Sequence, residues 1–183
     1  MYRIIITYTL VITPLIFIIF NSLFNNDIIN PFSYLITSTG YISLSLLLAV
    51  LCIPLLKNIS YFLDRKIFGL SAFTYTFGHL LLYIVDNNIS FKYLYTDVAS
   101  LLYIQVGYIA LLLFLPLVFT STVKAKLILK DNWFKIHRLI YIIIPLSFIH
   151  YYLLIKADYL LFIVYLIIFI LILILKNRYE SNE

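Results

Sequence analysis

The chain has 183 residues, of which 64% are hydrophobic and only 11% are charged, and its mean hydropathy is +1.06. A soluble domain carries about 25% charged residues, so this composition excludes a soluble globular protein and indicates a polytopic membrane protein. The formal net charge is +5, but the basic residues are scattered over short segments, which points to membrane topology rather than nucleic-acid binding. The single cysteine, Cys52, excludes an internal disulfide and any cysteine-built metal cluster.

Six apolar runs are long enough to cross a membrane. They cover approximately residues 4–20, 39–56, 68–85, 100–120, 134–154 and 159–175. Every backbone polar group that faces lipid must be satisfied within its own segment, so each run is predicted to be a helix. The predicted fold is an all-α membrane protein, a bundle of six transmembrane helices. We expect residues 1–176 to form this one domain and residues 177–183 to form a short polar tail.

Charged residues divide unevenly between the two ends of the predicted spans. One end carries Arg3, Lys57, Arg65, Lys66, Lys124, Lys126, Lys130, Lys176 and Arg178. The opposite end carries only Lys92 and Lys156, together with Asp27, Asp86, Asp97 and Asp158. Because cytoplasmic loops are enriched in lysine and arginine, this asymmetry predicts that both termini are cytoplasmic.

Three histidines lie inside the predicted spans: His79, His137 and His150. Each has an ordinary interpretation when taken alone, since His79 can hydrogen-bond to a neighbouring tyrosine and the other two can lie at the membrane interface. Together they are harder to dismiss, because ionisable or metal-ligating groups within a membrane are costly and usually mark function.

Spacing limits what His137 and His150 can do together. On one straight helix, thirteen residues correspond to roughly 20 Å and leave the two imidazoles about 140° apart, although a kink at Pro145 could change their relation. They are too distant to share a zinc ion, which needs at least three converging protein ligands. Haem iron takes His, Met, Cys or Tyr ligands, and Met1 is the only methionine. Two histidines from separate helices are therefore the favoured pair of haem ligands.

Residues along most of the chain match one known pattern in order and spacing. They are Thr39-Gly40 with Leu44; Pro54-Leu55; Arg65-Lys66, Gly69-Leu70, Ala72-Phe73, Tyr75, His79 and Tyr83; Tyr103-Ile104 and Val106-Gly107; Leu113, Leu115-Pro116-Leu117 and Thr120-Ser121; and Trp133, His137-Arg138-Leu139, Tyr141, His150-Tyr151 and Lys156. In these residues the chain resembles the haem-binding membrane subunit of bacterial periplasmic methionine sulfoxide reductase systems, the MsrQ or YedZ family. That family belongs to the ferric-reductase-like transmembrane group.

The resemblance implies an electron-transfer subunit of the bacterial inner membrane rather than a catalytic subunit. It implies one b-type haem, leaves a second haem open, and adds FMN as a further cofactor. The donor would be the quinone pool or a cytosolic flavin reductase. The acceptor would be a periplasmic molybdopterin-containing subunit that reduces methionine sulfoxide in proteins. Two redox alternatives are a stand-alone metalloreductase and a quinone-linked cytochrome b with another acceptor, and a non-redox transporter is the alternative from a different class.

Within this resemblance, His79 and His150 are expected to be the axial pair of the main haem. Depth along the helices does not by itself choose between His150 and His137 as the partner of His79. A haem in the outer half of the membrane, however, lies closer to the periplasmic acceptor. His137 is expected to ligate a second, inner haem or to orient a flavin or quinone. Arg138 is expected to pair with a haem propionate, because its guanidinium fork suits a carboxylate.

Overall fold

The computed structural model describes residues 2–156 and 159–180, and all regular secondary structure in these residues is helical. Contacts divide the chain into two compact units, Met1–Thr96 and Asp97–Glu183. Six helices are long and apolar enough to cross a membrane, as the sequence predicts. The prediction of an all-α membrane protein with six spans is therefore confirmed.

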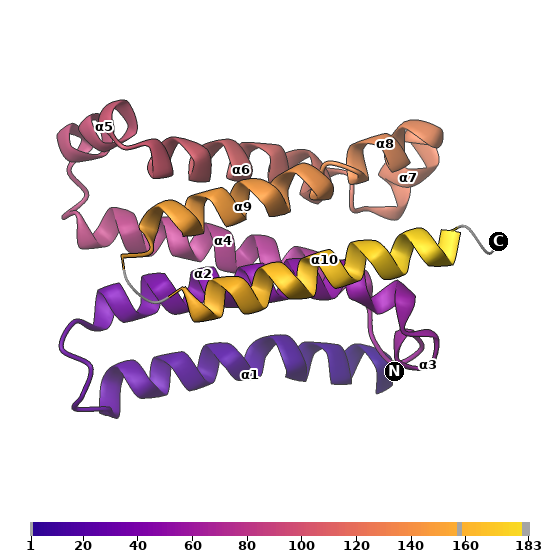
Figure 1. The fold of residues 1–183 in the computed structure, drawn as a ribbon, viewed down its shortest axis with the longest axis horizontal. Coiled ribbons are helices and arrows are strands. Elements are labelled where there is room, and N and C mark those ends of the chain that lie inside the picture. The colour runs from indigo at the N-terminus through magenta and orange to yellow at the C-terminus, as the bar shows by residue number, and fades with distance from the viewer. Residues whose placement is uncertain (1, 157–158, 181–183) are drawn as a thin grey trace. The chain divides into compact units, whose positions relative to one another are not determined.

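The first unit is built around the helix α2, Pro31–Cys52. It packs against α1, Tyr2–Phe24, and most extensively against α4, Arg65–Asp86, and Figure 1 shows α2 and α4 running side by side. Half of the residues in the most apolar window of α2 are buried, compared with 17% in that of α1. The short helices η1, Ile53–Leu55, and α3, Lys57–Ser60, connect α2 to α4.

Local signals explain where α2 begins and ends. The side chain of Asn30 accepts the backbone N–H of Ser33, and Pro31 occupies the first turn, where its missing N–H costs nothing. At the other end, Pro54 lies in the 3₁₀ turn η1 that follows α2. A proline cannot donate the hydrogen bond that would continue an α-helix, so the α-helical part ends at Cys52.

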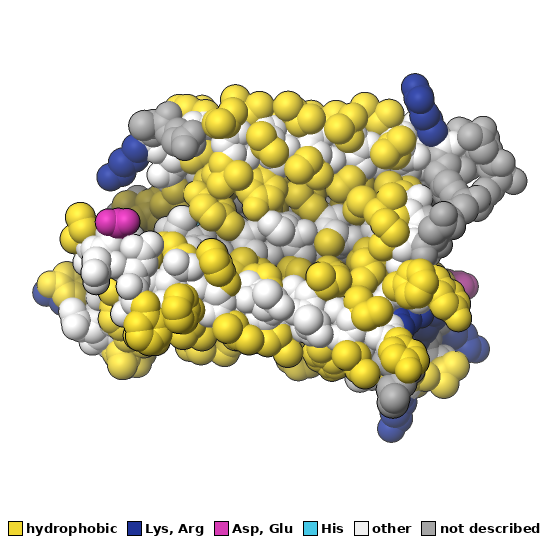
Figure 2. Space-filling view, turned by 90° about the horizontal axis from the view of Figure 1, so that it is seen from below, with side chains coloured by type: hydrophobic (Ala, Val, Ile, Leu, Met, Phe, Trp, Pro, Cys, Tyr) yellow, Lys and Arg dark blue, Asp and Glu magenta, His cyan; other side chains and the backbone are white. Residues whose placement is uncertain are grey.

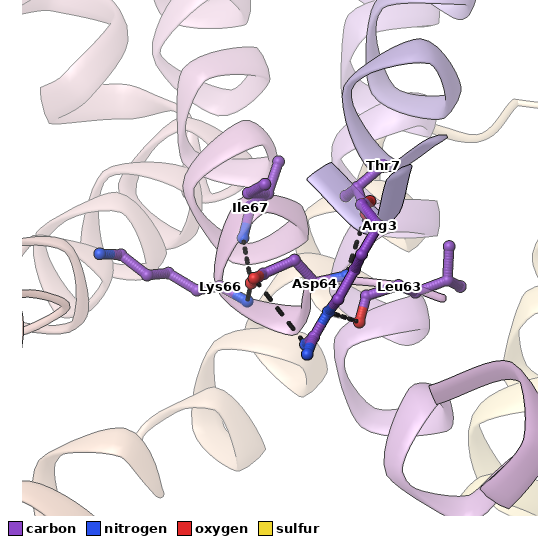
Figure 3. A network of polar contacts seen from close by, with 6 residues as sticks. All are labelled: Arg3, Thr7, Leu63, Asp64, Lys66 and Ile67. Carbon is purple, nitrogen blue, oxygen red and sulfur yellow. Dashed lines mark hydrogen bonds and ion pairs between the residues drawn. The ribbon is translucent and has the colours of Figure 1, made fainter. Parts of the chain in front are cut away.

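A polar network fixes the start of α4 against the start of α1 (Figure 3). The carboxylate of Asp64 caps α4 by accepting two backbone N–H groups of its first turn, at 2.9 and 3.4 Å. The hydroxyl of Thr7 accepts the backbone N–H of Asp64 at 3.0 Å and donates to the carbonyl of Arg3 at 2.8 Å. The guanidinium of Arg3 lies 3.8 Å from the Asp64 carboxylate and donates to the Leu63 carbonyl.

The second unit contains α6, Leu102–Phe119; α7, Val123–Leu129; α8, Asp131–His137; α9, Ile140–Leu154; and α10, Leu160–Glu180. The helices α6 and α9 form its main packed pair, and they also lie side by side in Figure 1. Ile143 and Ile144 of α9 are almost fully buried, and the ring of Phe148 contacts the rings of Phe162 and Phe169 on α10. These contacts make α9 the central helix of the unit.

Several features depart from the sequence-based expectations. The stretch expected to be one continuous fifth span is two helices, because α8 ends at His137 and α9 begins at Ile140. The estimate of 140° between His137 and His150 assumed a straight helix, whereas the structure interrupts the helix between these two residues. The helix α10 continues to Glu180, four residues into the expected tail, while residues 181–183 lie outside the described part. A further helix that was not expected, α5, covers Phe91–Ser100.

The surface of the long helices is apolar, as a lipid environment requires. Figure 2 shows hydrophobic side chains over most of the visible face, and the lysine and arginine side chains seen there lie near the helix ends. Exposed apolar residues are numerous on α1 and α10, including Phe17 at 63% and Leu171 at 52%. In water such a surface would drive aggregation, whereas in a bilayer it contacts lipid chains at no comparable cost.

Candidate functional site

His79 projects from α4 towards the backbone of α2. Its Nδ1 lies 2.7 Å from the carbonyl oxygen of Ile36. A carbonyl oxygen can only accept a hydrogen bond, so Nδ1 carries the proton and donates it. In the neutral imidazole the lone pair is then on Nε2, which is the form that can ligate a metal through Nε2.

His150 makes the same type of contact in the second unit. Its Nδ1, on α9, lies 2.7 Å from the carbonyl oxygen of Tyr103 on α6. The carbonyl again fixes the proton on Nδ1 and the lone pair on Nε2. Within each unit, one histidine is thus oriented by the backbone of the neighbouring helix, and both are only partly exposed.

A glycine lies four residues after each of these carbonyl groups. Gly40 follows Ile36 on α2, and Gly107 follows Tyr103 on α6. A Cβ added at Gly107 would lie 2.9 Å from Nδ1 and 3.0 Å from Cε1 of His150, whereas one added at Gly40 would lie 3.4 Å from the same two atoms of His79. Each imidazole therefore lies close against the backbone surface of its partner helix, and the contact is closest at Gly107.

Hydroxyl groups connect α2 to α4 one turn before His79. The hydroxyls of Ser43 and Thr76 are 2.6 Å apart, and both are within hydrogen-bonding distance of the Ala72 carbonyl, at 3.0 and 2.9 Å. Ser43 is buried, so these bonds are made in an apolar environment where an unpaired hydroxyl would be costly. They hold α4 in register with the carbonyl that His79 contacts.

His137 has different surroundings at the end of α8. Its ring stacks on the indole of Trp133, with centroids 3.9 Å apart and planes at 26°, and its Nε2 lies 3.2 Å from the hydroxyl of Thr120. The Thr120 hydroxyl donates its one hydrogen to the Pro116 carbonyl at 2.6 Å. It must then accept from His137, so Nε2 of His137 carries a proton. This is the opposite nitrogen from that protonated in His79 and His150.

Arg138 lies at the break between α8 and α9. It is exposed, and its backbone N–H bonds back to the carbonyls of Phe134 and Lys135. Nearby, the Trp133 indole donates to the Thr120 carbonyl at 2.9 Å, and the ammonium of Lys126 lies 4.9 Å from the centroid of the Trp133 ring. The structure therefore groups His137 with Trp133 and Thr120, while His79 and His150 are each held within their own unit.

The sequence pattern of the family described as "Ferric reductase like transmembrane component" matches residues 36–148. This chain belongs to that family. The matched region begins at Ile36, contains His79 and His137, and ends two residues before His150. The resemblance to the ferric-reductase-like transmembrane group, noted above from the sequence, is confirmed.

Curated relatives of this ferric-reductase-like chain bear the name "Protein-methionine-sulfoxide reductase heme-binding subunit MsrQ". The protein of Caulobacter vibrioides is 37% identical over 136 residues, which are 71% of this chain and 65% of the relative. That of Xanthomonas campestris is 36% identical over 125 residues, or 66% and 57% of the two chains, and that of Rhodospirillum rubrum is 40% identical over 96 residues, or 51% and 46%. The chain thus spans roughly half to two thirds of the length of these relatives. No solved structure matches it.

The donor groups of this chain fit a haem. Histidine is a common axial ligand of haem iron, and ligating histidines usually donate their other ring N–H to a carbonyl or carboxylate. His79 and His150 do this, each through Nδ1 to a backbone carbonyl. Sequence reasoning identified both histidines but missed the carbonyl groups that orient them. The sequence does contain a signal for the two sites where the histidines contact a helix backbone: the same tripeptide, Gly-Tyr-Ile, begins at Gly40 and at Gly107.

Proposed function

We propose that this chain is a membrane electron-transfer subunit that binds a b-type haem through His79 and His150. The observation that carries the proposal is the shared geometry of these two imidazoles. In each, Nδ1 donates a hydrogen bond to a helix carbonyl oxygen 2.7 Å away, and the lone pair is on Nε2. Bound haem iron supplies reversible one-electron transfer. Neutral imidazoles suit such a site, because a charged ligand within the membrane would be costly.

His137 serves the cytoplasmic end of the electron path in this proposal. Its Nε2 donates to Thr120 and its ring stacks on Trp133, an arrangement that suits positioning of a planar donor better than ligation of iron through Nε2. The proposed occupant is a flavin or quinone ring, and ligation of a second haem is the alternative. Arg138 follows His137 in the sequence and is exposed, so its guanidinium can pair with a propionate or phosphate.

The proposed partners follow from the resemblance to MsrQ. Electrons would come from quinol or a cytosolic flavin reductase and would leave to a periplasmic molybdopterin-containing subunit. Each methionine sulfoxide reduced there takes up two electrons and two protons and yields methionine and water. The subunit is proposed to lie in the bacterial inner membrane with both termini in the cytoplasm, because the basic residues concentrate at one end of the spans.

A second candidate is direct reduction of ferric complexes, which is favoured by the family description "Ferric reductase like transmembrane component". In that case the chain would pass electrons to an external ferric chelate without a protein acceptor. The two functions share the same haem ligands and differ only in the acceptor. FMN is proposed as a further cofactor under either of them.

The experiment is a reduced-minus-oxidised absorption spectrum of the purified chain, followed by turnover in sealed vesicles. A b-type haem spectrum is expected, and the haem should be reduced by a quinol or by a flavin reductase with NADH. Reoxidation by the molybdopterin subunit with methionine sulfoxide, but not by a ferric chelate, would support the first function, and the reverse would support the second. A protein that binds no haem when supplied with it would contradict both.

A further inference from the structure

Each ligand histidine proposed above contacts the same element of its neighbouring helix. In an α-helix the carbonyl of residue i accepts the N–H of residue i+4. The carbonyl of Ile36 is therefore the helix partner of the Gly40 N–H, and the carbonyl of Tyr103 is the partner of the Gly107 N–H. Each imidazole adds a hydrogen bond to a carbonyl that is already used by a glycine, and the Ile36 carbonyl also accepts the hydroxyl of Thr39 at 2.9 Å.

A side chain at the glycine position would obstruct the hydrogen bond from the imidazole to the carbonyl. At Gly107 an added Cβ would come within 2.9 Å of the donating nitrogen, a distance that real Cβ contacts essentially never show. At Gly40 the corresponding distance is 3.4 Å, which is at the near edge of ordinary contact. Absence of a side chain is thus needed at Gly107 and is less critical at Gly40.

Neither glycine is explained by backbone conformation. Among the described residues no glycine has a positive φ, so the usual reason for glycine does not apply here. Glycine in a helix interior normally costs stability relative to alanine. For the remaining two glycines, a Cβ at Gly69 would lie 3.9 Å from Val50, and one at Gly78 would meet nothing within 4 Å apart from its neighbours in the chain.

We propose that Gly107, and more weakly Gly40, are positioning residues that set the tautomer of the ligand histidines. By exposing a helix carbonyl, each allows Nδ1–H to be donated to the backbone and so places the lone pair of the imidazole on Nε2. The bond also increases the donor strength of the imidazole, which favours ferric over ferrous iron. The inference deepens the proposed function, since it concerns the same two histidines, but its first test does not require haem.

The first test uses the full-length chain with ¹⁵N-labelled histidine, in detergent and without haem. Three imidazoles are present, so their nitrogen shifts can be assigned by single histidine substitutions. Wild-type protein should show His79 and His150 protonated at Nδ1 and His137 protonated at Nε2. Protonation of both His79 and His150 at Nε2 in wild-type protein would overturn the inference without any glycine variant.

The second test compares Gly107→Ala with Gly40→Ala and with Gly69→Ala as the matched control. Gly107→Ala should move the proton of His150 from Nδ1 and lower haem affinity about tenfold, the lower end of the effect of losing such an orienting partner. In the haem that still binds, the midpoint potential should rise. Gly40→Ala should show smaller changes in the same directions, and Gly69→Ala should match wild type.

Outcomes separate this inference from the proposed function. If Gly107→Ala had the same nitrogen shifts, haem affinity and midpoint potential as wild-type protein, the proposed role of the glycine would be overturned. The haem proposal would remain intact. Absence of haem from wild-type protein and from every variant would contradict the proposed function, while the nitrogen shifts would still decide the tautomers. If Gly107→Ala does not fold, wild-type shifts together with Gly40→Ala and Gly69→Ala still decide the question.

Discussion

Replacement of Thr7 by valine tests the contact that joins the start of α1 to the start of α4. Thr7 is fully buried, and its hydroxyl accepts the backbone N–H of Asp64 at 3.0 Å. Valine has nearly the same shape but cannot accept, so this N–H loses its partner. A buried donor left unsatisfied costs about 1–3 kcal/mol, and because this contact is only part-buried we expect about 1–2 kcal/mol.

Thr9→Val is the matched control for this change. Thr9 is on the same helix and is exposed, and its hydroxyl donates to the Ile5 carbonyl of its own helix. Its replacement should change the free energy of unfolding by less than about 0.5 kcal/mol. The assay is reversible unfolding in mixed detergent and SDS micelles, followed by far-ultraviolet circular dichroism. If Thr7→Val were no more destabilising than Thr9→Val, the hydroxyl would not join the two helices.

Three further predictions concern the cap of α4, the inner histidine and the topology. Asp64→Ala should lower the free energy of unfolding by about 1 kcal/mol in the same assay, and Asp64→Asn should lose much less because asparagine is an equally good cap; equal losses would contradict the capping role. His137→Ala should retain haem but slow its reduction by the donor about tenfold, as expected for a lost hydrogen bond of about 1.4 kcal/mol; an unchanged stopped-flow rate would show that His137 is only an interface residue. Reporter fusions at Glu183 should be active in the cytoplasm, and periplasmic activity would reverse the predicted topology.

The six spans could be predicted because each is a long, predominantly apolar run, but their ends depend on capping. The second span was expected to begin at residue 39, whereas α2 begins at Pro31. Asn30 and Pro31 form a helix-start signal that a hydropathy criterion ignores. Similarly, α10 continues beyond the apolar residues to Glu180, because backbone hydrogen bonding does not require apolar side chains.

The break in the fifth span could not be predicted from composition. No glycine or proline marks it, and Pro145, where the sequence allowed a kink, lies within the helix α9. At the break, Leu139 bonds to the Ile136 carbonyl and Tyr141 to the Arg138 carbonyl, three residues back rather than four. Such tightened turns arise from packing of the neighbouring segments, which a single sequence does not reveal.

The candidate ligands were predictable, but their orientation was not. Histidines are few in this chain and lie in apolar runs, so the sequence alone singled out His79, His137 and His150. Which ring nitrogen carries the proton depends on atoms 43, 17 and 47 residues away, respectively. These contacts form only when the helices pack, and they divide three histidines that look alike in sequence into one pair and one distinct residue.

The most direct test of the proposed haem ligation is the haem content of three single variants purified in the same mild detergent. His79→Ala and His150→Ala should each lose the haem, because each removes one of the two imidazoles proposed to hold it, whereas His137→Ala should retain it. Haem is quantified per polypeptide from the reduced pyridine adduct, with folding checked by circular dichroism. Full retention in His150→Ala together with loss in His137→Ala would contradict the assignment and would place the second ligand at His137.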